Sequence, residues 1–284
     1  MWLGKGVFVL RIVEKVLRTG DGDIHYWTCF VEKERPWLVF LPGLTADHHL
    51  FDRQMVELGK KYNCLVWDAP GHGRSRPFAL RFSMDDMAEY LFQILQREEI
   101  QKPVLVGQSM GGFLSQVYLE LHPGGASGFV SIDSAPMGRR YYTKAELLFL
   151  RHTEGMYLSI PWELLIQWGS LGTAATGYGR SVMRWMMRQY GRKEYCALAA
   201  HGYRIVAGAV ETERAYEIRC PVLLLCGEKD AAGSGKRYNR SWARVTGYTL
   251  VWVPGAGHNS NCDRPDFING KIEQFIRFLP VRSW

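Results

Sequence analysis

Short runs of aliphatic and β-branched residues recur along the chain, and most of them end at a glycine or an aspartate. Most of these runs lack the alternation of polar and apolar positions that a half-exposed strand shows, so we expect strands buried on both faces of a sheet. The first two segments are joined by a stretch rich in Asp and Gly, which is typical of a hairpin turn. The pattern predicts eight strands, at residues 7–17, 24–31, 37–41, 64–67, 104–106, 129–132, 222–226 and 249–253.

Segments with apolar residues three and four positions apart separate many of these strands, and this spacing predicts helices at 51–58, 87–95 and 267–279. Ser83, with Asp86 three residues later, resembles a capping box at the start of the second helix. Alternating strands and helices connect by right-handed crossovers. We therefore expect an α/β fold with a mostly parallel sheet and helices on both faces.

The alternation stops between residues 137 and 210, where the sequence predicts no strand and only helix-like segments at 144–150, 162–168 and 179–190. We interpret 137–210 as a helical cap (lid) inserted into one core domain, formed by residues 1–136 and 211–284. A chain of 284 residues is long enough for two small domains, but one large core is the simpler interpretation.

The composition excludes several classes of protein. With 47% hydrophobic and 22% charged residues, the chain resembles an ordinary folded protein rather than a disordered or collagen-like one. No apolar run approaches the roughly 18 residues of a membrane span, and the short run at 7–10, followed by Arg11, does not match a secretion signal. The six cysteines (29, 64, 196, 220, 226 and 262) form no metal-binding spacing. We expect reduced thiols, no metal, and a cytoplasmic protein.

Most of the net charge of +7 lies in residues 137–210, which carry ten Lys or Arg against four Glu, or +6. Arg180, Arg184, Arg188 and Arg192 recur every four residues, which predicts an arginine stripe on one helix. Met183, Met186, Met187 and Tyr190 would lie on the opposing side. A solvated outer face is the simpler interpretation, and weak contact with an anionic surface is the alternative. No nucleic-acid-binding module accompanies these residues, so we expect no nucleic-acid partner.

A G-x-S-x-G motif at residues 107–111 follows a predicted strand and precedes a helical pattern. Its two glycines leave room for a tight turn that lifts Ser109 above the edge of the sheet. A serine hydroxyl is a poor nucleophile near neutral pH, so it needs a base within hydrogen-bond reach and a carboxylate that orients that base. A plain strand-to-helix turn is the alternative interpretation.

Two downstream loops can supply these groups, because Asp230 and His258 each end a loop that follows a predicted strand. Asp133 also follows a strand and is an alternative acid. His72, in a glycine-rich loop, is an alternative base, although a role in structuring the loop is favoured. Asp47, His48 and His49 are expected at the start of a short helix, with Asp47 as its N-cap, and contact with a substrate is the alternative.

The chain resembles the α/β-hydrolase superfamily in four places: the elbow at 107–111, the loop at 227–230, Gly257-His258, and the segment Asp68-Ala69-Pro70-Gly71-His72-Gly73-Arg74-Ser75. The order Ser, Asp, His along the chain is also that of this superfamily. An oxyanion needs two N–H donors, and the backbone of Met110, just after the serine, is one candidate. The resemblance implies a second donor at Leu44, although Pro42-Gly43 replaces the His-Gly that commonly begins this loop.

The expected activity is hydrolysis of a carboxylic ester through an acyl-enzyme, with no cofactor and a small apolar or aromatic substrate. Substrate contacts are expected from Gly43 and from the cap residues Trp162 and Trp185. The same triad could serve a C–C bond hydrolase, a thioesterase, a lactonase or a cofactor-free perhydrolase. The serine argues against dehalogenase or epoxide-hydrolase chemistry, for which relatives use a carboxylate. A ligand receptor without turnover remains the alternative from another class.

Overall fold

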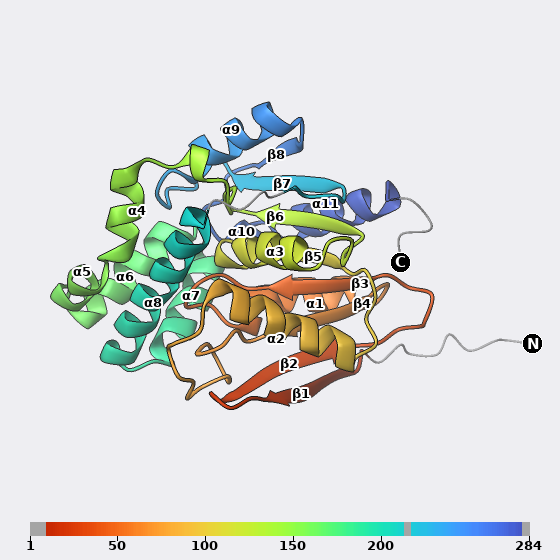
Figure 1. Cartoon of the computed structure of the whole chain (residues 1–284), viewed down its shortest axis with the longest axis horizontal. Helices are drawn as coiled ribbons and strands as arrows, with labels where there is room; N and C mark the ends of the chain where they lie inside the picture. The colour runs from red at the N-terminus through yellow and green to blue at the C-terminus, as the bar shows by residue number, and fades with distance from the viewer. Residues whose placement is uncertain (1–9, 213–216, 280–284) are drawn as a thin grey trace, which may run out of the picture.

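The computed structural model describes residues 10–212 and 217–279, and an eight-stranded sheet forms its centre (Figure 1). All eight strands predicted from the sequence are present. The predicted first strand begins earlier than β1, and its residues 7–9 lie outside the described ranges. The strands are β1 (Ile12–Arg18), β2 (Asp23–Cys29), β3 (Trp37–Leu41), β4 (Asn63–Trp67), β5 (Val104–Gln108), β6 (Gly128–Ile132), β7 (Val222–Gly227) and β8 (Thr249–Val253).

The strand order is β1-β2-β4-β3-β5-β6-β7-β8. β1 and β2 form the predicted hairpin, and β2 also pairs antiparallel with β4. All pairs from β4 to β8 are parallel, so the carboxyl ends of six strands meet at one edge. In such sheets ligands bind at this edge, outside the carboxyl ends of the strands.

Helices cover both faces of the sheet, as predicted. Along β3, Leu38 and Phe40 face one core cluster while Val39 and Leu41 face the other. One face packs against α2 (Met84–Arg97), α3 (Met110–Leu121) and α9 (Gly235–Thr246), and the other against α1 (Asp52–Leu58) and α11 (Pro265–Arg277). The predicted capping box at the start of α2 is present, with Ser83 as the N-cap.

In the described residues between β6 and β7, all the secondary structure is helical: η2 (Arg139–Tyr141), α4 (Lys144–Arg151), α5 (Glu154–Ser159), α6 (Trp162–Thr173), α7 (Gly177–Arg188) and α8 (Arg192–Glu211). These helices, α4–α8, are called the helical insertion below. They lie together beyond the carboxyl ends of the parallel strands (Figure 1). The part of the chain that the structure describes contains no helix long and apolar enough to cross a membrane.

The prediction of four arginines on one helix is wrong. α7 ends at Arg188, and the next helix begins at Arg192, after the extended backbone of Gly191. The Glu194 carboxylate accepts a hydrogen bond from the Gly191 N–H, which caps the start of α8. The four-residue spacing therefore runs across a break between helices. Met183, Met186 and Met187 of α7 are buried.

Candidate active site

Ser109 lies at the turn between β5 and α3, and its backbone is strained. Its φ of 50° and ψ of −117° fall in a region that L-residues rarely adopt. The Ser109 N–H donates to the Ile132 carbonyl (2.9 Å), and the Ser134 hydroxyl donates to the Ser109 carbonyl (2.7 Å). A Cβ at Gly111 would collide with the backbone carbonyl of Leu41, so the turn requires glycine there.

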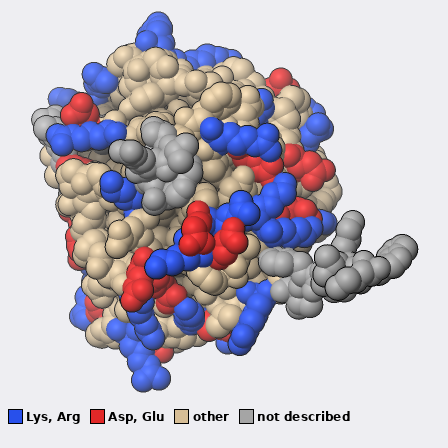
Figure 2. Space-filling model, turned by 90° about the vertical axis from the view of Figure 1, so that its right-hand side faces the viewer, with Lys and Arg blue, Asp and Glu red and all other residues tan. Residues whose placement is uncertain are grey.

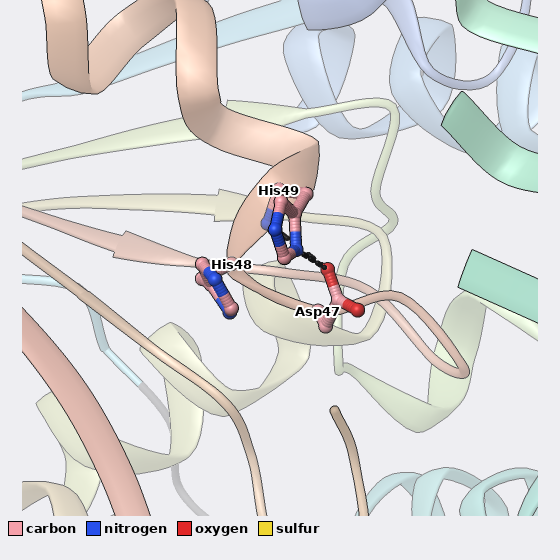
Figure 3. A group of neighbouring side chains, drawn as sticks. All are labelled: Asp47, His48 and His49. Atoms are coloured by element: carbon pink, nitrogen blue, oxygen red, sulfur yellow. Dashed lines mark hydrogen bonds and ion pairs between the residues drawn. The ribbon is translucent and has the colours of Figure 1, made fainter. Parts of the chain in front are cut away.

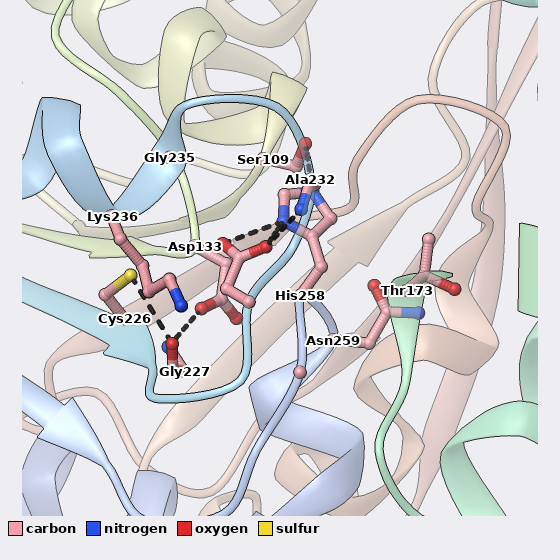
Figure 4. Close-up of polar contacts among 12 residues, drawn as sticks. Ser109, Asp133, Thr173, Cys226, Gly227, Ala232, Gly235, Lys236, His258 and Asn259 are labelled. Carbon is pink, nitrogen blue, oxygen red and sulfur yellow. Dashed lines mark hydrogen bonds and ion pairs between the residues drawn. The ribbon is translucent and has the colours of Figure 1, made fainter. Parts of the chain in front are cut away.

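The structure brings the three residues predicted as a triad into one hydrogen-bonded chain. His258 Nε2 lies 2.9 Å from Ser109 Oγ, and the two side chains face each other in Figure 4. His258 Nδ1 lies 3.2 Å from both carboxylate oxygens of Asp230. Asp230 is 2% exposed, and its Oδ1 also accepts from the Ala232 N–H at 2.8 Å. The carboxylate is thus aimed at the imidazole from a buried position.

Two opposing effects set the pKa of His258. Burial disfavours the charged imidazolium and lowers the pKa, but the Asp230 charge and hydrogen bond raise it, and so does the charge of Asp133. The charges prevail, so the pKa of His258 lies above its ordinary value. The charges of Asp230 and Asp133 thus favour the protonated, imidazolium form of His258.

Asp133, the alternative acid, makes its hydrogen bonds elsewhere. Its Oδ1 accepts from the Gly227 N–H (2.7 Å), and its Oδ2 accepts from the Ser260 N–H (2.9 Å) and hydroxyl (2.5 Å). It therefore joins the loop that carries Asp230 to α10 (Ser260–Asp263), just after His258. Burial and the nearby Asp230 charge raise the pKa of Asp133 to about 7.

The predicted oxyanion loop lies against Ser109. A Cβ at Gly43 would come 3.0 Å from the Cβ of Ser109. Next to it, the Leu44 side chain rests on Gly202 of α8, where a Cβ would collide with it. Within the described residues, no backbone or side-chain acceptor is recorded for the N–H groups of Leu44 and Met110. Both N–H groups are therefore available to an external oxygen.

The other predicted residues lie near this loop. Trp162 packs its ring edge against Tyr195, whose hydroxyl lies 3.3 Å from the Thr45 hydroxyl. Trp185 is 45% exposed and packs edge-on against His49, 4.3 Å between ring centroids. Their contact with a substrate stays a prediction.

His72 is buried, and its Nδ1 lies 2.9 Å from the Pro70 carbonyl oxygen in the same loop. This bond fits the favoured role of structuring the loop. Burial lowers the pKa of His72, so its neutral form is favoured.

Sequence reasoning did not single out Asp263, which binds the helical insertion to the loop of His258. Its Oδ1 accepts from the Thr176 N–H (2.8 Å) and hydroxyl (2.6 Å), and its Oδ2 accepts from the N–H groups of Ala175 and Gly257 (2.7 and 2.8 Å). Beside it, the Asn259 N–H donates to the Thr173 carbonyl (2.7 Å), and these two residues are adjacent in Figure 4. The α6–α7 turn therefore holds the residues on both sides of His258.

Asp47, His48 and His49 place one metal-ligating atom each within 4.8 Å of one another (Figure 3). As predicted, Asp47 caps the short helix η1 (His48–Phe51). His49 Nδ1 lies 2.9 Å from Asp47, and His48 Nδ1 lies 2.9 Å from Asp68. The two imidazoles pack against each other with centroids 3.9 Å apart. Ligand lone pairs lie in the ring plane, so packed rings with occupied Nδ1 atoms are poorly arranged to share an ion.

Asp133, Cys226 and Asp230 form a second such group. The Asp133 carboxylate already accepts hydrogen bonds from Gly227 and Ser260, and the Asp230 carboxylate is hydrogen-bonded to His258. Burial, and then the two aspartates, raise the pKa of the Cys226 thiol well above its ordinary value, so the thiol stays protonated. We assign no metal to either group.

Comparison with known proteins agrees with this architecture. A model of the alpha/beta hydrolase fold family matches residues 36–265. The chain is 25% identical to the 2-succinyl-6-hydroxy-2,4-cyclohexadiene-1-carboxylate synthase of Serratia proteamaculans (strain 568), over 93% of this chain and 98% of that protein.

Two solved structures share the fold. The Cif epoxide hydrolase from Acinetobacter nosocomialis has a TM-score of 0.78 at 15% identity, covering 96% of this chain and 92% of that one. A thermophilic esterase from Thermogutta terrifontis has a TM-score of 0.69 at 18% identity, covering 94% and 98%. The family match supports a hydrolytic role, and the two structures, at 15% and 18% identity, show a shared fold. Since the family model spans most of its length, the chain belongs to the alpha/beta hydrolase fold family.

Proposed function

We propose that this protein is a serine hydrolase that cleaves a carboxylic ester, with Ser109, His258 and Asp230 as its catalytic triad. One observation carries the proposal: the continuous hydrogen-bonded chain from Ser109 Oγ through both ring nitrogens of His258 to the buried Asp230. A strained serine, a base and an orienting carboxylate in this order are what acyl transfer through a covalent intermediate requires.

In the first half-reaction Ser109 Oγ attacks the ester carbonyl carbon while His258 Nε2 takes the hydroxyl proton. The Nδ1–H of the same ring stays bonded to Asp230, whose charge stabilises the imidazolium. The carbonyl oxygen becomes an oxyanion between the N–H groups of Leu44 and Met110. Loss of one such donor typically costs about 10²- to 10³-fold in rate.

In the second half the tetrahedral intermediate collapses, and His258 returns its proton to the leaving alcohol. A water molecule, deprotonated by the same imidazole, then attacks the acyl-enzyme. The acid product leaves and Ser109 Oγ is protonated again. The chain's own residues thus account for every proton transfer.

An apolar or aromatic acyl group is the favoured substrate. The helical insertion lies beyond the carboxyl ends of the parallel strands, and it is rich in aromatic residues, including Trp162 and Trp185. The relative from Serratia proteamaculans is a synthase, and one structural neighbour is an esterase. Other carbonyl substrates, such as a thioester, a lactone or a C–C bond next to a carbonyl, use the same triad and are outcomes of the test below.

The test is a p-nitrophenyl ester series from acetyl to decanoyl, with fluorophosphonate labelling measured by intact mass. Ser109→Ala should lose both turnover and labelling. The matched control is Ser127→Ala, because the buried Ser127 hydroxyl has no hydrogen-bond partner among the described residues and should be dispensable. Labelling without ester turnover would redirect the assignment to a thioester or C–C substrate. Neither labelling nor turnover would contradict the proposal and favour a receptor.

A further inference from the structure

Large apolar side chains are unusually exposed on the helical insertion. Sixteen such side chains are exposed among the described residues, and nine of them lie between residues 144 and 188. These nine are Leu148, Phe149, Met156, Leu158, Leu164, Trp168, Leu171, Tyr178 and Trp185. Single exposed apolar residues are ordinary, but a concentration of them on one substructure marks an interaction surface.

Helix α6 shows the effect most clearly, because it is apolar on two opposite sides. Leu165 and Ile166 face the core and are 4% and 1% exposed. Leu164, Trp168 and Leu171 follow at spacings of four and three, which places them on one side of the helix. These three side chains are 39%, 55% and 46% exposed. A group of large apolar side chains on the outer side of a helix is normally covered, so this side is expected to have a partner.

The charges on the same substructure favour an anionic partner. All four carboxylates of residues 137–210 are already paired with arginines: Glu146 with Arg237, Glu154 with Arg204, Glu163 with Arg188 and Glu194 with Arg76. By contrast, five basic residues of the helical insertion have no carboxylate partner within the described ranges: Lys144, Arg180, Arg184, Arg192 and Lys193. The helical insertion therefore presents uncompensated positive charge together with its apolar side chains.

The opposite end of the molecule differs in charge pattern. Figure 2 views that end, where basic and acidic side chains are interspersed. Outside the helical insertion acidic side chains also pair with basic ones, and Glu273 forms ion pairs with both Lys61 and Arg277. The excess of positive charge is thus specific to the helical insertion.

We propose that the outer surface of the helical insertion, centred on Leu164, Trp168 and Leu171 of α6, docks on an anionic lipid bilayer. Leucine and tryptophan enter the interfacial region of a bilayer, and flanking Lys and Arg bind acidic headgroups. A second copy of this chain fits less well, because a symmetric dimer would bring two surfaces of the same +6 segment together. Docking would turn the carboxyl edge of the sheet, with Ser109, toward the bilayer. It goes beyond the proposed chemistry and does not depend on it.

The test is co-sedimentation of the full chain with vesicles of phosphatidylcholine alone or of equal parts phosphatidylcholine and phosphatidylglycerol. Wild type and Ser109→Ala should both bind the anionic vesicles and only weakly the neutral ones, with binding that falls as salt rises. The variant L164S/W168S/L171S should reduce partitioning roughly 100-fold, because it removes three half-exposed apolar side chains. Arg184→Gln should reduce partitioning about fivefold, because among the described residues the Arg184 side chain hydrogen-bonds only to the Ser181 hydroxyl and its charge is free to bind a headgroup.

Phe30→Ser is the matched control, because Phe30 is 62% exposed and directly follows β2, at the end of the sheet away from the helical insertion. It should bind like wild type. Circular dichroism checks that each variant is folded. If the triple variant does not fold, Arg184→Gln and the salt series test the proposal in its place. Absence of binding to anionic vesicles, or binding that these substitutions leave unchanged, would overturn the proposal. Dimerisation in light scattering that the triple variant abolishes would assign the surface to a second copy.

Discussion

Replacing Asp263 with asparagine tests whether the helical insertion holds the loop of His258 in place. The carboxylate accepts four hydrogen bonds, three of them from backbone N–H groups. An asparagine of the same shape offers one carbonyl oxygen and one NH₂ group. In the amide orientation that keeps more hydrogen bonds, the oxygen accepts from the N–H groups of Ala175 and Gly257. The NH₂ group then faces the Thr176 hydroxyl, and the Thr176 N–H is left without an acceptor.

The expected cost follows from these contacts. An orphaned buried N–H costs about 1–3 kcal/mol, and two charge-assisted bonds become neutral ones at about 1 kcal/mol each. Asp263→Asn should therefore destabilise the fold by about 3–5 kcal/mol. At an unfolding entropy of roughly 2.1 cal/mol/K per residue, a chain of 284 residues should then lose roughly 5–8 °C in Tm. Because Gly257 precedes His258, ester kcat/KM should also fall about tenfold at temperatures where the protein stays folded.

The assay combines thermal unfolding with kcat and KM on the preferred p-nitrophenyl ester. Asp266→Asn is the matched control, because Asp266 is exposed, lies three residues further along, and has no recorded ion pair in the described ranges. A Tm within 1 °C of wild type would refute the assigned strength of these bonds. A large fall in Tm with unchanged kcat/KM would show that Asp263 stabilises the fold without positioning His258.

Three further predictions follow from the site. Activity needs neutral His258, so the acidic limb of the kcat/KM profile should lie above pH 6.5. Asp133→Asn removes a negative charge near His258 and should move this limb to lower pH. A limb that does not move would contradict the effect of the Asp133 charge on the pKa of His258. Because the pKa of Asp133 is about 7 in the folded chain and about 3.9 unfolded, the folded state holds the extra proton between these values. Unfolding free energy should therefore fall as pH rises from about 4 to 7, and urea titrations should show a shallower fall in Asp133→Asn. Gly111→Ala should abolish folding, because the added Cβ collides with the backbone of Leu41. Gly270→Ala is the control: an added Cβ there meets open space, and the substitution should raise the free energy of unfolding by about 0.5–1 kcal/mol. A folded, active Gly111→Ala protein would contradict the assigned collision.

The strands were predictable because a strand that is buried on both faces needs a short, continuous run of aliphatic residues, and such a run is visible in the sequence. The helices were less so. α9 buries only Tyr238, Asn239 and Trp242, which leaves a narrow apolar stripe on a polar segment. The start of α8 was obscured because the arginine spacing continues across the break at Gly191. Helix ends depend on capping contacts, such as that of Glu194, which periodicity does not report.

The sequence by itself determined the α/β fold, the position of Ser109 in its elbow, and the two loops that supply Asp230 and His258. These features depend on neighbouring residues: glycines that admit a strained turn, and polar residues at strand ends. Only the tertiary structure decided that Asp230 rather than Asp133 bonds to His258, since both follow strands that end at the same edge. It alone showed that Asp263 holds Thr176, a contact across 87 positions of the chain. Such a contact has no local pattern, because its partners become neighbours only when the helical insertion packs over the sheet.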